Sequence, residues 1–161
     1  MNPSYFRIKL NINDAISKLC AWNDGTYKEK IETRYSQAVR VCIDEKGQLK
    51  GQCLYGYERD GWTIFEDLSG AYSFIETDSW LEFADNNEFL LAGYNDAIIY
   101  AELLAITDGK VTKHFLECDD CPEENVNEGE GIPDIENWVD VASYVDEDEL
   151  IYSEKGTVLI F

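Results

Sequence analysis

Short stretches in which apolar and polar residues alternate recur along this chain, and turn sequences separate them. Residues 6–12 and 62–66 show this period of two, which is typical of strands with one buried face. Asp-Gly pairs at positions 60–61 and 108–109 favour tight turns between consecutive strands. Because strands joined by tight turns run in opposite directions, the pattern predicts a mostly antiparallel twisted sheet.

Further stretches have the composition of strands. They are residues 38–44, 48–57, 88–94, 98–107, 111–116, 150–152 and 157–161. The first two are expected to form a hairpin around Glu45-Lys46-Gly47, which would make the N-terminal half an antiparallel meander. Residues 26–36 are polar, and the sequence does not decide their secondary structure.

Short helices are expected at three places. They are residues 14–22, 80–84 and 135–145, which follow the candidate caps Asn13 or Asp14, Thr77-Asp78-Ser79, and Asp134. The apolar face expected for the third helix consists of Ile135, Trp138, Val139, Ala142 and Val145. Because the expected strands outnumber the expected helices, the sequence predicts an α+β fold. This fold would be a mostly antiparallel twisted sheet with two or three short helices packed against it. We expect a single domain spanning residues 1–161.

The sequence points to the cytoplasm as the compartment. No apolar run reaches the roughly 18 residues that a membrane span needs, and residues 1–13 lack the basic and then apolar order of a signal peptide. No membrane partner is therefore expected. The five cysteines are an odd number and scattered, unlike a disulfide framework. Cys20, Cys42 and Cys53 have apolar neighbours and are expected to serve as packing residues.

The net charge of −20 is distributed unevenly. Residues 1–60 carry ten Lys or Arg and eight Asp or Glu, whereas residues 114–154 carry fifteen Asp or Glu and neither Lys nor Arg. Self-repulsion in such a block opposes compaction. The block is therefore either a solvated face that aids solubility or a surface that binds a positively charged partner.

The pair Cys118 and Cys121 lies inside this block and raises the question of a metal or redox site. A structural zinc site needs four ligands, and with His114 the set would still need a carboxylate or a distant cysteine. A redox dithiol needs a lowered thiol pKa, which the neighbouring carboxylates disfavour. Residues 117–131 do not follow the EF-hand order of calcium ligands. No metal or other cofactor is expected.

Motifs for catalysis and for nucleic-acid binding are absent from the sequence. It contains no G-x-S-x-G, Walker, Rossmann or H-E-x-x-H pattern, and the single histidine has no marked partner. Phosphate contacts need clustered Lys and Arg, whereas the acidic half of this chain would repel a nucleic acid. The sequence therefore predicts a binding protein without catalysis and without a nucleic-acid partner.

A dense carboxylate surface speeds the encounter with a basic protein and disfavours other partners. Nucleases are basic because their substrate is a polyanion, so a nuclease domain is the expected partner. The residues expected to bind it are Asp119, Asp120, Glu123, Glu124, Glu128, Glu130, Asp146, Glu147, Asp148 and Glu149. Trp138 and Tyr144 lie on the helix between the two acidic runs and could supply aromatic anchors.

Three stretches carry a resemblance to a known group of proteins. YERDGWTIFEDLSGAYSFIETDSWLEFA, LLAGYNDAIIYAELLAI and NVNEGEGIPDIENWVDVASYVDED cover most of residues 56–150. Their layout resembles the acidic α+β immunity proteins of bacterial polymorphic and contact-dependent growth-inhibition toxin systems. The resemblance implies a cognate toxin domain, commonly a nuclease, that is neutralised one to one in the cytoplasm. The first 55 residues add nothing to it.

An alternative from another functional class stays open. The segment from Tyr94 to Asp96, together with Tyr100, could line the pocket of a small enzyme or ligand-binding domain. A turn is the competing role for Asn95 and Asp96. The pocket hypothesis requires a cavity with converging polar groups, and a solid core would count against it.

Overall fold

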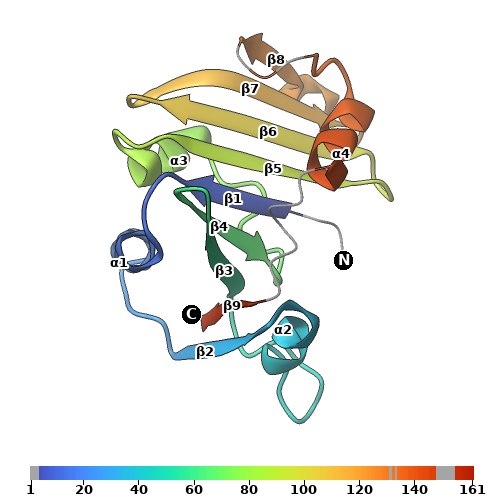
Figure 1. The fold of residues 1–161 in the computed structure, drawn as a ribbon. Coiled ribbons are helices and arrows are strands. Elements are labelled where there is room, and N and C mark those ends of the chain that lie inside the picture. Colours follow the sequence, from blue (N-terminus) through green and yellow to red (C-terminus); the bar gives the residue numbers. More distant parts are fainter. Residues whose placement is uncertain (1–3, 131, 133, 148–154) are drawn as a thin grey trace.

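The computed structural model describes residues 4–130, 132, 134–147 and 155–161, and in this part of the chain nine strands form one sheet (Figure 1). The strands are β1 (Ser4–Ile8), β2 (Glu29–Arg34), β3 (Cys53–Arg59), β4 (Trp62–Asp67), β5 (Phe89–Asn95), β6 (Tyr100–Thr107), β7 (Lys110–Cys118), β8 (Val126–Gly129) and β9 (Lys155–Ile160). Their order is β2-β9-β3-β4-β1-β5-β6-β7-β8, and every neighbouring pair is antiparallel. The predicted α+β class with an antiparallel sheet is confirmed.

Helices lie on both faces of the sheet (Figure 1). α1 (Ile12–Trp22) and α3 (Thr77–Ala84) cover one face, and α2 (Tyr35–Val41) and α4 (Trp138–Glu147) cover the other. The face under α1 and α3 holds an aromatic cluster around Phe6. Its ring centroid lies 5.1–6.3 Å from those of Phe65, Tyr72, Trp80, Phe83 and Phe89. Such tilted and edge-on contacts add to the free energy gained by burying the rings.

The predicted meander of the N-terminal half is wrong in its strand order. β3 and β4 form the expected hairpin across Asp60-Gly61, but β1 lies between β4 and β5, and β9 lies between β2 and β3. β1 can take a central place because its side chains are apolar on both faces, as the full burial of Tyr5 and Ile8 shows. Alternation of apolar and polar residues within a strand predicts which face is buried, but not which other strands pair with it.

The strand expected at residues 38–44 is also wrong. This stretch belongs largely to the helix α2, and only the bridge between Ile43 and Leu49 remains of the hairpin. Ala38 and Cys42, four residues apart, are both fully buried, which is the spacing of a helix face. Residues 26–36, left open by the sequence, contain the edge strand β2.

All three predicted helices begin at other residues than expected. α3 begins at Thr77, so the expected caps Thr77-Asp78-Ser79 lie in its first turn, and Glu76 takes the N-cap position without a side-chain hydrogen bond. Asn11 caps α1, its side chain accepting a hydrogen bond from the Asp14 amide at 3.0 Å. α4 begins at Trp138 rather than at residue 135, because the Asn137 side chain accepts from the Val139 amide at 2.9 Å. Val139, expected on the apolar face, is 48% exposed, and Val141 is fully buried in its place.

The strands expected at residues 6–12 and 48–57 are wrong in their bounds, because β1 ends at Ile8 and β3 begins at Cys53. The remaining predictions are confirmed or lie outside the described residues. The strands expected at residues 62–66, 88–94, 98–107, 111–116 and 157–161 correspond to β4, β5, β6, β7 and β9. Cys42 and Cys53 are buried as expected, and Cys20 is half-buried. The strand expected at residues 150–152 falls outside the described residues.

One register row crosses all nine strands on the face under α2 and α4. It consists of Ile31, Val158, Tyr55, Glu66, Tyr5, Ala92, Leu103, Phe115 and Asn127, in the order of the strands. Glu66 is the carboxyl at the centre of this row and is only 7% exposed. Its Oε1 accepts a hydrogen bond from the Tyr35 hydroxyl at 2.9 Å. Burial raises the pKa of Glu66 from 4.5 to about 7.

This pKa makes the folding stability depend on pH. Between pH 4.5 and 7 the native state holds the Glu66 proton that the unfolded state releases, so the free energy of unfolding falls as pH rises. The variant Glu66→Gln, which mimics the protonated acid, should match the native protein near pH 5 and be more stable at pH 8 by about 3 kcal/mol. Denaturant unfolding at pH 5, 6, 7 and 8 measures this difference.

Glu82→Gln is the matched control, because Glu82 is an exposed carboxylate on α3. Its stability difference from the native protein should stay constant over the same pH range. A Glu66→Gln protein less stable than the native one at pH 8 would contradict the assignment.

Candidate functional site

The acidic segment expected to be a loop forms regular structure between residues 117 and 130. After β7 the chain makes the short 3-10 helix η1 (Pro122–Glu124) and returns as β8, which pairs with β7 along the edge of the sheet. Cys118 and Cys121 form a disulfide just before η1, with their Cα atoms 5.3 Å apart. Asn125 Oδ1 accepts a hydrogen bond from the Cys118 amide at 2.8 Å. The sequence prediction missed β8 because most of its residues are exposed, so no apolar alternation marks it.

We call the predicted binding carboxylates within the described residues the acidic surface. Its members Asp119, Asp120, Glu123, Glu124, Glu128, Glu130 and Asp146 are all exposed. None of them forms a salt bridge with another described residue. Of the remaining predicted residues, Glu147 is the last residue of α4, and Asp148 and Glu149 lie outside the described residues.

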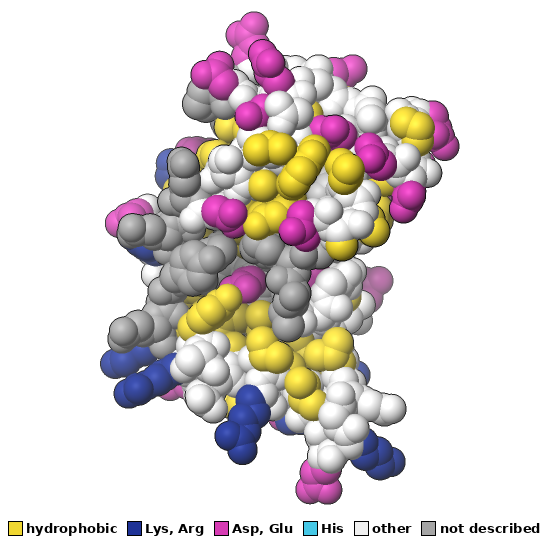
Figure 2. Space-filling view, turned by 90° about the vertical axis from the view of Figure 1, so that its right-hand side faces the viewer, with side chains coloured by type: hydrophobic (Ala, Val, Ile, Leu, Met, Phe, Trp, Pro, Cys, Tyr) yellow, Lys and Arg dark blue, Asp and Glu magenta, His cyan; other side chains and the backbone are white. Residues whose placement is uncertain are grey.

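The structure separates the two signs of charge along the sheet. Figure 2 shows carboxylates around the upper part of the molecule and most of the visible Lys and Arg side chains around the lower part. Six of the seven members of the acidic surface flank the edge strand β8, and Asp146 lies on α4, where it accepts a hydrogen bond from Tyr94 on β5. The exposed cations Lys30 and Arg34 lie on β2 at the opposite edge, and Lys113 on β7 is buried and donates to Asn127.

Two other carboxylates of the acidic block have structural roles. Glu117 Oε2 accepts a hydrogen bond from the Trp138 amide at 2.6 Å, at the first residue of α4. Asp140 Oδ2 accepts from the amides of Glu136 and Asn137 at 2.9 and 3.1 Å. Both groups satisfy free amides near a helix N-terminus, where negative charge is favourable. They position α4 and are not available to a partner.

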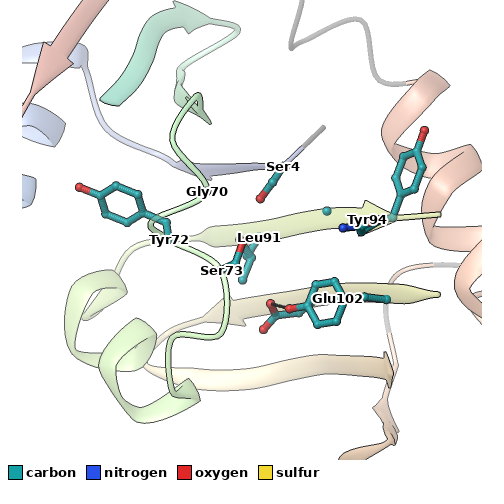
Figure 3. A pocket seen from close by; sticks show the side chains of 10 residues that line it. Ser4, Gly70, Tyr72, Ser73, Leu91, Tyr94 and Glu102 are labelled. Atoms are coloured by element: carbon teal, nitrogen blue, oxygen red, sulfur yellow. Dashed lines mark hydrogen bonds between the residues drawn. The ribbon is translucent and has the colours of Figure 1, made fainter. Parts of the chain in front are cut away.

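A pocket of about 180 Å³ lies on the opposite face of the sheet. It is lined by Ser4, Gly70, Tyr72, Ser73, Leu91, Gly93, Tyr94, Asn95, Tyr100 and Glu102. β1, β5 and β6 form its floor, and the loop after β4 forms its wall (Figure 3). Gly93 leaves room above the floor, since a Cβ there would lie 2.9 Å from Ser4 Oγ.

The polar centre of the pocket is Glu102. This side chain is 8% exposed, and its Oε2 accepts a hydrogen bond from the Tyr100 hydroxyl at 2.7 Å. Burial raises the pKa of Glu102, and burial together with the Glu102 carboxyl raises the pKa of Tyr100. The lining contains no Lys or Arg that would neutralise the carboxylate.

Asp67, at the end of β4, organises the loop that forms the wall. Its Oδ1 accepts hydrogen bonds from the amides of Ser69 and Gly70, both at 2.9 Å, and from the Ser69 hydroxyl at 2.8 Å. Its Oδ2 accepts from the Tyr72 amide at 2.9 Å. The loop then reaches Tyr100, whose ring centroid lies 4.7 Å from that of Phe74. One buried carboxylate therefore fixes the start of the loop, and contact with a tyrosine ring of the pocket holds its end.

The backbone beside the pocket adopts unusual conformations. Phe74 has φ of 59° and Ile99 has φ of 46°. Every other non-glycine residue with positive φ in the described chain is an aspartate, a residue type that tolerates this region. For the β-branched Ile99 the conformation is strained, and such strain gathers at functional sites.

The structure corrects the residues expected around this pocket. Tyr94 contributes only its backbone, since its side chain points away toward α4, where its hydroxyl donates to Asp146 at 3.0 Å (Figure 3). Asn95 accepts from the Ala97 amide at 3.0 Å, which is the turn role, and Asp96 does not line the pocket. Sequence reasoning missed Glu102, although a lone carboxyl in the apolar stretch of β6 was a signal for it.

Among the described residues, no three or more His, Cys, Asp or Glu side chains are arranged so that they could hold a metal ion. His114 instead faces Glu128 across β7 and β8, and burial lowers its pKa.

Replacement of Asp67 by Asn should destabilise the protein by about 2 kcal/mol. The amide keeps one acceptor oxygen and turns an NH2 group toward amides that the carboxylate had satisfied. Urea unfolding measures the loss. Asp96→Asn, which changes the same charge at an exposed turn residue, should change stability by less than about 0.5 kcal/mol. Equal effects of the two substitutions would contradict the role of Asp67.

Comparison of the chain with family models, with curated proteins and with solved structures finds no match. No residue role is therefore taken from a relative, and the two sites described above rest on the geometry of this chain. The resemblance to acidic immunity proteins, which rests on sequence layout, stays a prediction.

Proposed function

We propose that this protein is an immunity protein that binds and neutralises a basic toxin domain through the acidic surface, without catalysis of its own. The observation that carries the proposal is the set of seven exposed carboxylates, six of them beside one edge of the sheet, none of which forms a salt bridge with a described cation. A surface of this kind attracts a cationic partner from a distance. A nuclease domain of a bacterial contact-dependent growth-inhibition or polymorphic toxin is the partner proposed.

Apolar side chains near the acidic surface support binding to a protein. α4 presents Val139, 48% exposed, and Trp138 beside it is half-buried. Figure 2 shows hydrophobic side chains in the upper half of the same view with carboxylates around them. Interfaces combine an apolar centre, which supplies much of the affinity, with a polar rim that sets rate and orientation.

The proposed compartment is the cytoplasm, where a toxin with an intracellular target must be neutralised. None of the helices in the described part of the chain is long and apolar enough to span a membrane.

The first test is rescue of growth. The chain is co-expressed with the basic C-terminal domain of the toxin gene proposed to lie next to its own gene. The native chain should restore growth, because a bound toxin domain cannot reach its target. Absence of a toxic domain among the neighbouring genes would contradict the proposal.

Charge reversal of the acidic surface should slow association with that domain. The triple substitution Glu123→Lys, Glu124→Lys and Glu128→Lys is expected to lower the association rate constant at least tenfold at low salt, because it removes the attraction that steers the encounter. Raising the salt concentration should slow the native protein toward the variant, since exposed charges are screened. Stopped-flow or surface-binding kinetics measure both effects.

The matched control reverses the same number of charges elsewhere. Glu32→Lys, Glu45→Lys and Glu58→Lys alter exposed carboxylates remote in sequence from the acidic surface. This control changes the net charge equally but should slow association much less. If both triple variants slow it equally, only net charge matters and the acidic surface is not the interface.

The alternative of a small enzyme or ligand-binding domain is favoured by one observation, the pocket around Glu102. It lies close to the segment from Tyr94 to Asp96 expected to line it, although its polar centre is a different residue. Because the pocket and α4 lie on opposite faces of the sheet, the two kinds of binding do not exclude each other.

A further inference from the structure

The pocket around Glu102 combines features that select a particular class of ligand. Its acidic group is buried, its lining residues include no cation, and its remaining polar side chains are uncharged. A carboxylate held away from water is costly unless a positive group or several donors accompany it. Tyr100 supplies one donor, to Oε2. A ligand that enters the pocket can supply the rest.

The two serine hydroxyls of the pocket, unlike those of Tyr72 and Tyr100, are uncommitted. The side chains of Ser4 and Ser73 line the cavity, and neither forms a hydrogen bond with another described side chain or backbone group. A hydroxyl can accept a hydrogen bond as well as donate one. An ammonium group has three donors and no acceptor, so a carboxylate and two hydroxyls can satisfy it completely.

The size of the pocket limits the rest of the ligand. Its volume is about 180 Å³, somewhat larger than the cavity of about 150 Å³ that holds a benzene molecule in another protein. Leu91, 3% exposed, and the backbone of Gly93 offer an apolar surface. A compact body of roughly six to eight non-hydrogen atoms fits this space.

We propose that this pocket binds a small primary amine, with its ammonium group on the Glu102 carboxylate and a compact apolar body against Leu91 and Gly93. The proposal is independent of the acidic surface and of any toxin partner. The loop held by Asp67 closes the pocket on one side, and the strained residues Phe74 and Ile99 flank it. The raised pKa of Glu102 adds a consequence: a bound ammonium must displace the proton, so affinity rises with pH up to the point where the amine itself loses its charge.

The test uses benzylamine, which has the required size and charge, and benzyl alcohol, its neutral counterpart. Both are titrated into the full chain at pH 8 and followed by the backbone amide signals of Gly93 and Glu102 in nuclear magnetic resonance spectra. Benzylamine is expected to bind at least tenfold more tightly than benzyl alcohol. Glu102→Gln should abolish the preference for the amine, because it removes the charge and preserves the shape.

Two controls separate the pocket from the general negative charge of the protein. Glu82→Gln removes an exposed carboxylate on α3 and should leave the preference unchanged. Gly93→Ala, whose Cβ would lie 2.9 Å from Ser4 Oγ at the floor of the pocket, should weaken the binding of both compounds. If Glu102→Gln does not fold, Gly93→Ala shows whether the compounds occupy this pocket, and the ratio of the two affinities for the native protein tests the role of the carboxylate.

Three results would overturn the proposal. They are equal affinity for benzylamine and benzyl alcohol, an amine preference that survives in Glu102→Gln, and benzylamine shifts confined to residues of the acidic surface. None of these results bears on toxin neutralisation, so the two proposals fail separately.

Discussion

The pairing of β1 with strands on both of its sides holds this molecule together. β1 joins β4 and β5, and without it the sheet would fall into two groups of four strands. Its successive residues also serve three different regions: Ser4 lines the pocket, Tyr5 stands beside Glu66, and Phe6 is the centre of the aromatic cluster. Both pairings connect residues far apart in sequence, so the architecture depends on long-range contacts that form only when the whole chain is present.

Local patterns in the sequence predicted the strands that an Asp-Gly turn joins to the next strand. The hairpin of β3 and β4 and the hairpin of β6 and β7 are of this kind. Strand order could not be predicted, since the insertion of β1 and β9 reflects packing between distant segments rather than local alternation. α2 was mistaken for a strand because seven residues give too short a run to separate the two periods. β8 escaped notice because an exposed edge strand carries no apolar signal.

The candidate sites differ in how far sequence could define them. Charge is additive along a chain, so the acidic surface followed directly from composition, and every described member of it proved exposed. The pocket depends instead on contacts between β1, β5, β6 and the loop after β4. Only Glu102 had a local signal, a carboxyl at an inward position in an apolar strand, whereas Ser4 and Ser73 carried none.

Carboxylates along β8 also bear on how the sheet ends. An exposed edge strand offers unpaired backbone groups to other chains, and charged side chains discourage such pairing. Glu128 on β8 and Glu130 just after it can serve this role without any partner. Edge protection, however, needs only a few charges on the strand itself. It does not explain Asp119, Asp120, Glu123 and Glu124, which precede β8 on a segment fixed by a disulfide. Their concentration on one ordered segment is the arrangement expected if the proposed cationic partner binds there.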